Sequence, residues 1–415
     1  MKYSDSLHYL NSFLNFERIT YHPKNHLWNL DRMRILLDWF DHPEKNFFPI
    51  LIAGTKGKGS TGFFLESVLA ASGIRTGFYS SPHLEDPRER IRLATKMVSQ
   101  REWLNGIREI HRVLSKRHLN PGYGDFTYFE IMTLLAMLIF RKQGIQVGIF
   151  EVGMGGRLDA TNVLNAQLAI LTPIYLDHEA FLGNTVTQIA REKAAIIRPN
   201  ADVVVSPQSP EARLVIDREI RKKKAGLLKA APYKGSVGLA GDYQKINAGA
   251  AVQAAKVLRQ KHGFSIPNQA IFKGLKASGW PGRFERFSGR PEYVLDGAHN
   301  PSSIEALTRV LRKKYAGRDR LLIFGTSRDK KSAAMLKELG SFFDRVILAP
   351  LPTVRSQEMA VLMREARPHF RFIFPAFNIR RALDLAKQIA QAKTLVVATG
   401  SFYLIGEIRK LIRHA

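Results

Sequence analysis

A glycine-rich turn between an apolar run and a helical pattern constrains the fold of this chain more than any other stretch. Residues 47–52 are typical of a buried strand, residues 63–69 begin a helix, and the turn between them has the sequence GTKGKGS at 54–60. Glycine lets backbone N–H groups approach phosphate oxygens, the helix N-terminus adds positive potential, and a lysine neutralises charge. Because Gly59 separates Lys58 from Ser60, the match to G-x-x-x-x-G-K-[ST] is imperfect, and an ordinary strand-to-helix connection is the alternative.

Further apolar runs alternate with helical patterns along the N-terminal two thirds of the chain. Strands are expected at 75–79, 145–150, 168–171 and 202–205, with helices between them. This alternation predicts an open, mostly parallel α/β sheet, whose ligands bind at the carboxyl ends of the strands. Polar clusters follow the strands at 54–60, 81–83, 151–159 and 177–178. We therefore expect these clusters to meet at one crevice.

The length of the chain, 415 residues, exceeds what a single ordinary core supports, so two domains are expected. A turn-rich segment at 279–283 precedes a second α/β rhythm, with strands expected at 321–324, 346–348, 372–374 and 395–398. We predict an N-terminal P-loop-type domain at 1–288, with an open and mostly parallel sheet, and a smaller Rossmann-like α/β domain at 289–415.

Composition excludes several classes of protein. The chain has no cysteine, which rules out disulfides, thiolate metal sites and cysteine nucleophiles. The longest apolar run, 131–140, is shorter than the roughly 20 residues that span a bilayer. The first five residues lack the charged-then-apolar pattern of a signal peptide. We expect a cytoplasmic, monomeric protein with no membrane partner.

The formal net charge of +27 is unusual. One interpretation is nucleic-acid binding, because phosphate contacts dominate that kind of affinity. The other is a basic surface tuned for solubility, with some attraction for anionic substrates. Positive residues are spread along the whole chain, and the densest run, 221–224, follows a helix-like segment. We therefore expect no nucleic-acid partner.

A series of short motifs runs in a fixed order along nearly the whole chain. They are GTKGKGS at 54–60, SSPHL at 80–84, TYFE at 127–130, EVGMGGRLDATN at 151–162, LDH at 176–178, EKA at 192–194, Gln244 with Asn247, WPGR at 280–283 and DGAHNP at 296–301. In this order they resemble the folylpolyglutamate synthase/dihydrofolate synthase family of the Mur ligase superfamily. The blocks at 151 and 296 are the most specific, and the phosphate loop is the least.

The resemblance implies an ATP-dependent amide ligase. ATP would phosphorylate the carboxylate of dihydropteroate, or of a folate's terminal glutamate, and the amino group of L-glutamate would attack the acyl phosphate. The products would be dihydrofolate or folylpolyglutamates, from one enzyme with both activities. Residues 1–288 would form the ATP- and pterin-binding central-type domain, and residues 289–415 the glutamate-ligase domain. The nearest rival is a ligase with another acceptor, such as a cell-wall precursor, against which the motifs at 127–130 and 296–301 argue.

The resemblance also implies which residues bind ATP. Lys58 would contact the β- and γ-phosphates, with donors from Gly57, Gly59 and Ser60. Adenine, phosphate and ribose contacts would come from Asn247, Arg283 and Asp296 respectively. A carboxylate must approach a strongly negative triphosphate, so the site needs cations that cancel repulsion and hold the groups in line. Arg283 stands at the domain junction, so ATP would lie between the domains.

Three residues match the metal contacts of the family, which are expected to hold two Mg²⁺ ions. Glu151 ends a buried strand, where a carboxylate needs a cation or donors nearby, and a core salt bridge is the alternative. Ser81 and His178 are the other two. Histidine is a softer ligand than Mg²⁺ usually takes. The residues alone therefore favour a structural or general-base role for His178, and its place as a ligand comes from the resemblance.

Lys193 matches the position of a carbamylated lysine in the family. A lysine with a lowered pKa can add CO₂, which turns a cation into a carboxylate suited to a metal cluster. Sequence alone favours a helix lysine that pairs with Glu192. The carbamate is therefore an implication of the resemblance.

The pterin or folate pocket is expected from three segments of the family pattern, which are Leu27, Trp28, Asn29 and Leu30, then Thr127, Tyr128, Phe129 and Glu130, then Leu158, Asp159 and Ala160. Aromatic rings at 128 and 129 offer faces for a flat pterin, and helix packing is the alternative. His299 is expected in the cleft with no assigned role. The chain departs from the family at Lys56, where asparagine is usual, around residues 28–29, and at Ala195, where glycine is usual.

Overall fold

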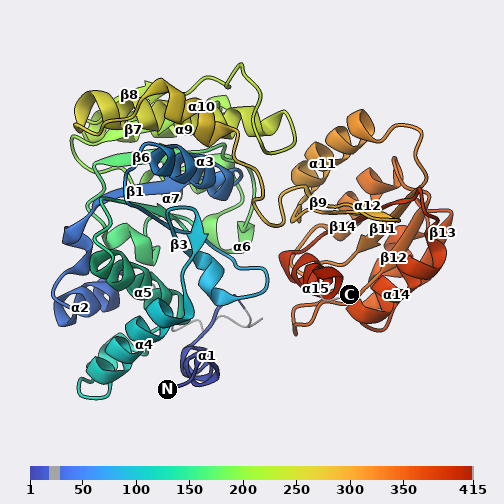
Figure 1. The fold of residues 1–415 in the computed structure, drawn as a ribbon, viewed down its shortest axis with the longest axis horizontal. Helices are drawn as coiled ribbons and strands as arrows, with labels where there is room; N and C mark the ends of the chain where they lie inside the picture. Colours follow the sequence, from blue (N-terminus) through green and yellow to red (C-terminus); the bar gives the residue numbers. More distant parts are fainter. Residues whose placement is uncertain (18–28, 414–415) are drawn as a thin grey trace.

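The computed structural model describes residues 1–17 and 29–413 and, within them, arranges the chain in two α/β units (Figure 1). The strands of the first unit are β1 (Phe48–Ala53), β2 (Thr76–Tyr79), β3 (Ile91–Leu93), β4 (Lys96–Met97), β5 (Val147–Glu151), β6 (Leu168–Leu171), β7 (Asp202–Val205) and β8 (Gly226–Lys229). Its helices are α1 (Tyr3–Asn11), α2 (Asp31–Trp39), α3 (Lys58–Ala71), α4 (Gln100–Leu114), α5 (Tyr128–Lys142), α6 (Glu179–Leu182), α7 (Val186–Ala194), α8 (Pro210–Lys222), α9 (Tyr243–Lys261) and α10 (Asn268–Leu275). Short 3-10 turns are η1 (Pro43–Asn46), η2 (Pro87–Arg90), η3 (Pro121–Tyr123) and η4 (Ala160–Val163).

The second unit repeats the alternation of strand and helix. Its strands are β9 (Glu285–Phe287), β10 (Glu292–Leu295), β11 (Arg320–Phe324), β12 (Arg345–Leu348), β13 (Phe372–Pro375) and β14 (Leu395–Thr399). Its helices are α11 (Pro301–Lys314), α12 (Ser332–Gly340), α13 (Met359–Ala366), α14 (Ile379–Ile389) and α15 (Phe402–Arg413). Among the residues described, none of these or the earlier helices combines the length and the apolar character that crossing a bilayer requires.

Each unit is built on one mostly parallel sheet. Over the described residues the first sheet has eight strands in the order β4-β3-β2-β5-β1-β6-β7-β8, and the second has six in the order β13-β12-β11-β14-β10-β9. Within these described strands, the antiparallel pairs are β2–β3 and β3–β4 in the first sheet and β9–β10 in the second. The predicted fold class, an open mostly parallel sheet followed by a smaller α/β domain, is confirmed.

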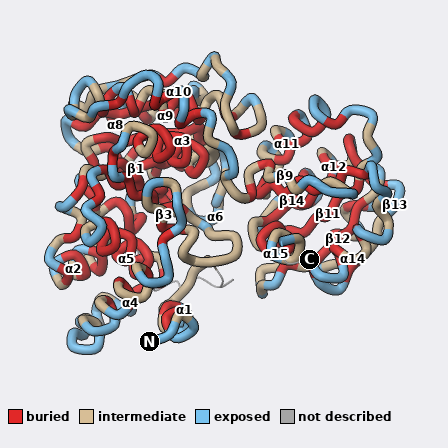
Figure 2. Tube along the Cα trace, viewed as in Figure 1, coloured by how far each residue is buried: buried red, intermediate tan, exposed pale blue. Residues whose placement is uncertain are grey.

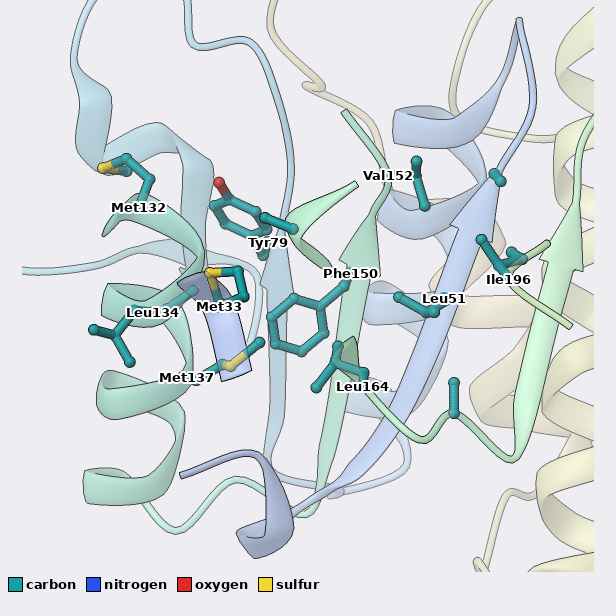
Figure 3. Packing of buried hydrophobic residues seen from close by; sticks show 14 of the residues in the cluster. Met33, Leu51, Tyr79, Met132, Leu134, Met137, Phe150, Val152, Leu164 and Ile196 are labelled. Atoms are coloured by element: carbon teal, nitrogen blue, oxygen red, sulfur yellow. The ribbon is translucent and has the colours of Figure 1, made fainter. Parts of the chain in front are cut away.

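The strands of the first sheet are apolar throughout because helices cover both faces. Side chains alternate along β1, so Leu51 packs with α2, α4 and α5, whereas Ile50 and Ile52 pack with α3, α9 and α10. Figure 3 shows Leu51 and Phe150 on one of these faces. Full burial of a Leu or Phe contributes about 1.5–3 kcal/mol. The two layers therefore fix the positions of the strand ends.

The second sheet is covered in the same way, by α11, α12 and α13 on one face and by α14 and α15 on the other. Figure 2 shows buried residues concentrated inside each unit, with intermediate residues between them. Each unit therefore has a core of its own.

The chain passes from the first unit to the second between Trp280 and Phe284. The Trp280 ring lies 5.1 Å from the Phe63 ring on α3, whereas Phe284 belongs to the core of the second unit. Strand β9 pairs with β10, so the second sheet begins at Glu285, a few residues before the boundary that the sequence predicts at 288. The linker is thus anchored on the helix that follows the phosphate loop.

Candidate active site

A cavity of about 1200 Å³ lies between the two units and is lined by residues of both. Loops after β1, β2, β5 and β6 line it from the first unit, and loops after β10 and β14 from the second. These are the carboxyl ends of parallel strands, where open α/β sheets bind ligands. The structure therefore brings together the four polar clusters that the sequence places at strand ends.

The phosphate loop joins β1 to α3 at one side of this cavity. Gly57 has φ +85°, and a Cβ atom there would lie 2.1 Å from Asn247 Oδ1, so only glycine fits between the loop and α9. Helix α3 begins at Lys58, which directs its first N–H groups toward the cavity. Lys58 Nζ lies 3.3 Å from Gly54 O and 3.9 Å from Glu151 Oε1. The loop thus offers a cation and backbone donors to an anion.

All the residues predicted to bind ATP line the cavity, namely Gly57, Lys58, Gly59, Ser60, Asn247, Arg283 and Asp296. The Asn247 amide donates to Gln244 Oε1 at 2.8 Å, which fixes its orientation beside Gly57. The Arg283 guanidinium lies 4.5 Å from the centre of the Phe402 ring, at the junction of the two units. Burial raises the pKa of Asp296, whose carboxylate accepts hydrogen bonds from two backbone N–H groups.

Glu151, the last residue of β5, is 5% exposed. Burial raises the pKa of its carboxyl group, and the positive charges of Lys58 and then Arg283 oppose that rise. The Ser81 backbone N–H donates to Glu151 Oε2 at 3.4 Å, so two of the predicted metal ligands are in contact. A buried carboxylate beside a phosphate loop favours a cation as its partner.

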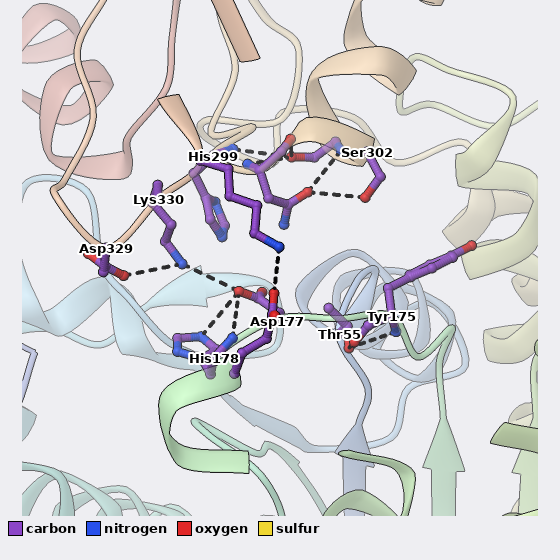
Figure 4. A network of polar contacts seen from close by, with 12 residues as sticks. Thr55, Tyr175, Asp177, His178, His299, Ser302, Asp329 and Lys330 are labelled. Carbon is purple, nitrogen blue, oxygen red and sulfur yellow. Dashed lines mark hydrogen bonds and ion pairs between the residues drawn. The ribbon is translucent and has the colours of Figure 1, made fainter. Parts of the chain in front are cut away.

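His178 is the residue just before α6 and has a left-handed backbone at φ +51°. Its Nε2 atom lies 4.0 Å from Asp177 Oδ1 (Figure 4). Burial is the main cause that lowers the pKa of His178 to about 4, so its ring is neutral near pH 7 and has a nitrogen lone pair for a ligand. Asp177 in turn accepts from Lys330 of the second unit at 3.4 Å.

Lys193 lies on α7, is 5% exposed and is not among the residues that line the cavity. Burial, with the positive charge of Lys58, lowers its pKa to about 7. A neutral amine is therefore populated at physiological pH. This is the form that reacts with CO₂, so the environment suits the modification that the family resemblance implies.

The donor set fits a divalent cation that keeps water and phosphate oxygens as further ligands. Ser81, Glu151 and His178 all line the cavity, and they offer a hydroxyl, a carboxylate and a neutral imidazole. Among residues 1–17 and 29–413, no cluster of three or more His, Cys, Asp or Glu side chains forms an all-protein cage. Mg²⁺ bound with substrate phosphates commonly uses one or two carboxylates. One buried glutamate is consistent with that pattern.

Most of the residues predicted for the pterin pocket also line the cavity, which are Asn29, Thr127, Phe129, Glu130, Leu158, Asp159 and Ala160. Leu30 and Tyr128 do not line it, and Leu27 and Trp28 lie outside the described residues. Tyr128 is 3% exposed and belongs to the core of the first unit. Of the two adjacent rings, Phe129 is the one that faces the cavity.

The carboxylates of this pocket already have hydrogen-bond or ion-pair partners within the protein. Glu130 accepts from Thr127 N at 2.7 Å, which caps α5, and pairs with Arg32 at 2.9 Å. Asp159 accepts from Met154 N and from the Thr161 hydroxyl, at 3.0 and 2.6 Å. Both residues therefore hold the shape of the wall that Phe129 completes.

Several residues that line the cavity were not predicted from the sequence, among them Arg32, Lys330, Arg355 and Tyr403. Lys330 follows the end of β11, so the rule that places ligands at strand ends could have found it. Arg32 is buried on α2, where only its pairing with a distant glutamate reveals it. His299 was predicted and lines the cavity, with Nδ1 2.8 Å from Gly297 O, and burial lowers its pKa to about 4.

Comparisons with known proteins agree with this architecture. Residues 282–402 match the family model described as "Mur ligase, glutamate ligase domain". A folylpolyglutamate synthase of Lacticaseibacillus casei is 32% identical over 99% of both chains, and a dihydrofolate synthase/folylpolyglutamate synthase of Bacillus subtilis is 30% identical over 92% of this chain and 95% of its own.

Solved structures give the same result over nearly the whole length. A Mycobacterium tuberculosis folylpolyglutamate synthase complexed with ADP superposes with a TM-score of 0.89 at 28% identity and covers 99% of this chain and 98% of its own. Escherichia coli FolC in complex with DHPP and ADP superposes with a TM-score of 0.85 at 28% identity and covers 100% and 98%. The chain therefore belongs to the folylpolyglutamate synthase/dihydrofolate synthase family.

Proposed function

We propose that this protein uses ATP to ligate L-glutamate to dihydropteroate and to the terminal glutamate of a folate. The observation that carries the proposal is the shared cavity, in which the phosphate loop, the buried carboxylate of Glu151 and the Phe129 wall face one space between two units. An ATP-dependent ligase whose acceptor has a flat aromatic ring and a carboxylate requires a phosphate site, a cation site and an aromatic wall. Relatives named for these two activities, and a neighbour solved with ADP and DHPP, support the same chemistry.

The reaction runs in two steps. A carboxylate oxygen of the acceptor attacks the γ-phosphorus of ATP, the bond to the bridging oxygen breaks, and ADP leaves. The amino nitrogen of L-glutamate then attacks the acyl carbon, phosphate leaves, and the nitrogen loses a proton. Lys58 and Arg283 offset the repulsion between the acceptor carboxylate and the triphosphate. The second unit excludes water from the acyl phosphate when it covers the cavity.

The cation site is assigned to Ser81, Glu151 and His178, and Mg²⁺ there would polarise the transferred phosphoryl group. One neighbour, from Yersinia pestis, was solved with AMPPNP and a Mn ion, which supports a divalent cation in this family. Lys193 is assigned as the carbamylated lysine, because its buried amine has a pKa of about 7 and shares the electrostatic environment of Lys58. The pocket of Phe129, Leu158 and Ala160 is assigned to the pterin ring.

ADP release tests this function directly. Purified protein is assayed with ATP and Mg²⁺, with dihydropteroate and tetrahydrofolate side by side, each with and without L-glutamate. We expect continued ADP release, beyond one equivalent per enzyme, only when an acceptor and glutamate are both present, because the first step alone can release a single ADP. It stays a prediction that the protein is a monomer, lies in the cytoplasm and acts on small molecules. If RNA or DNA alone stimulated ADP release, the basic charge would instead mark a nucleic-acid-dependent ATPase, and the proposal would be wrong.

A further inference from the structure

The phosphate loop carries two lysines whose side chains point to different units. Lys58 stays within the first unit, beside Gly54 and Glu151. Lys56 crosses the cavity, and its Nζ atom donates to the hydroxyl of Ser302 on α11 of the second unit. One loop therefore has a cation directed at the phosphate site and another that touches the opposite wall.

The backbone beneath Lys56 is fixed by the segment that follows β6. The backbone N–H groups of Thr55 and Lys56 both donate to Pro173 O, at 3.0 and 3.2 Å. The Thr55 hydroxyl donates to Tyr175 O at 3.0 Å and accepts from Tyr175 N at 3.1 Å. The Lys56 ammonium lies 4.8 Å from the centre of the Tyr175 ring, a cation–π distance. The contacts with Pro173 and Tyr175 therefore set the direction of the Lys56 side chain.

The contact point in the second unit is equally well fixed. The Ser302 hydroxyl donates to Asn300 Oδ1 at 3.3 Å, and Asn300 caps α11 by accepting from Ser303 N at 2.9 Å. Figure 4 shows Thr55 and Tyr175 on one side of the network and Ser302 with His299 on the other. Lys56 therefore reaches the end of the motif at 296–301, which carries Asp296.

We propose that Lys56 is a positioning residue that joins the phosphate loop to α11 and so sets the second unit over the bound nucleotide. The inference rests on the proposed function, because it concerns closure over ATP. An ammonium at the N-terminus of a helix is opposed by the helix dipole, and a partly exposed polar contact contributes little stability. The contact therefore acts on the relative position of the two units, beside the Lys330–Asp177 contact, and adds little to the stability of either.

A double-mutant cycle between Lys56 and Ser302 tests this role. Lys56→Met, Ser302→Ala and the double variant are compared by kcat, by KM for ATP and by the dissociation constant of ADP. We expect each single variant to lose about fivefold in kcat and the double variant to lose no more, because both changes remove one contact. The dissociation constant of ADP should stay within about twofold of the wild type, because Lys58 is intact. Lys56→Arg should restore most of the activity, and Lys96→Met, an exposed lysine on β4, serves as the matched control.

Three results would overturn the inference. Losses that multiply in the double variant would show that the two residues act independently. A roughly tenfold weaker ADP complex in Lys56→Met alone would make Lys56 a phosphate contact. Equal loss in Lys56→Arg and Lys56→Met would exclude a cationic contact with α11. Failure of the proposed function itself is separate, since wild-type protein would then release no ADP in response to acceptor and glutamate.

Discussion

The charged groups of the two units that form the cavity differ in how fully partners within the protein compensate their charge. In the first unit, Glu151 lines the cavity and Lys193 is buried outside its lining, and burial raises the pKa of Glu151 and lowers that of Lys193, which favours the neutral form of each. In the second unit, the Asp296 carboxylate is held by two backbone N–H groups, and Lys330 pairs with Asp177 and Asp329 at 3.4 and 3.6 Å. The first unit therefore keeps two groups, Glu151 and Lys193, whose charge a ligand must complete, whereas Asp296 and Lys330 of the second unit already have partners within the protein.

This difference suggests a division of labour between the units. The groups that would take a cation or CO₂, Glu151 and Lys193, belong to the first unit, so the reaction should fail when they are changed. Groups that are already bonded hold the second wall in shape, so changes there should weaken binding and closure. Four variants, taken from the largest expected effect to the smallest, test this division.

Glu151→Gln should have the largest effect. The amide keeps the volume but loses the negative charge, so we expect kcat to fall roughly a hundred- to a thousandfold. Stability should be kept, because a buried neutral amide avoids the desolvation cost of a carboxylate. Glutamate-dependent ADP release and thermal unfolding measure the two effects.

Glu66 provides the matched control for this variant. It is fully buried on α3, pairs with Arg92 at 2.8 Å and does not line the cavity. Glu66→Gln should therefore lower stability by breaking a buried pair while most of the activity remains. If both glutamine variants lost activity and stability together, Glu151 would be a structural residue and the proposed contrast between the walls would fail.

Lys193→Ala should come next, with a loss of about a hundredfold in kcat. Short carboxylates such as acetate should restore part of the activity, because they replace the carboxylate of a carbamate. Wild-type protein in ¹³C-bicarbonate should give a carbamate signal by NMR that the variant lacks. An unmodified lysine together with no rescue would assign Lys193 to structure alone.

The site was predictable where its residues follow the carboxyl ends of parallel strands, although those strands lie far apart in the sequence. Parallel strands present their carboxyl ends at one edge, so the clusters that contain Lys58, Glu151 and His178 could be grouped from the strand pattern alone. Long-range pairing was not predictable. Arg32 meets Glu130 across 98 residues of sequence, and no local pattern marks such a pair.

The sequence also could not predict which side chain in the first turn of α5 faces the cavity. Tyr128 and Phe129 both follow the Thr127 cap, and either ring could have faced the pterin. Adjacent helical residues point about 100° apart, so packing of α5 on the sheet decides which ring is exposed. The core takes Tyr128, and Phe129 lines the cavity.

Arg283→Met tests the second wall and should act mainly on binding. The guanidinium stacks on Phe402, where methionine can keep part of the packing but not the charge. We expect KM for ATP to rise about tenfold and kcat to change less. Arg290→Met, at an exposed position, is the control. A loss confined to kcat would place Arg283 with the reacting groups of the first wall and break the comparison.

The smallest effect is the pH dependence of stability at Lys56. Burial lowers the pKa of Lys56 to about 8, although Glu305 and Asp177 oppose that shift. Between pH 8 and the ordinary value of 10.5, the unfolded chain holds a proton that the folded protein has released, so the free energy of unfolding rises with pH. Below pH 8 both states are protonated, and the cost of burying the charge is fully present.

Lys56→Met removes this titration. The variant should be more stable than the wild type below pH 8, and the difference should shrink toward pH 10.5. We expect the difference to be under about 1 kcal/mol, because the side chain is partly exposed and solvent screens its charge. Urea unfolding of both proteins at pH 7, 8, 9 and 10 measures it, with Lys96→Met as the reference. If the difference in stability stayed constant with pH, the ammonium of Lys56 would be as well solvated as that of a surface lysine. The buried charges of the first wall would then lie only at the metal site.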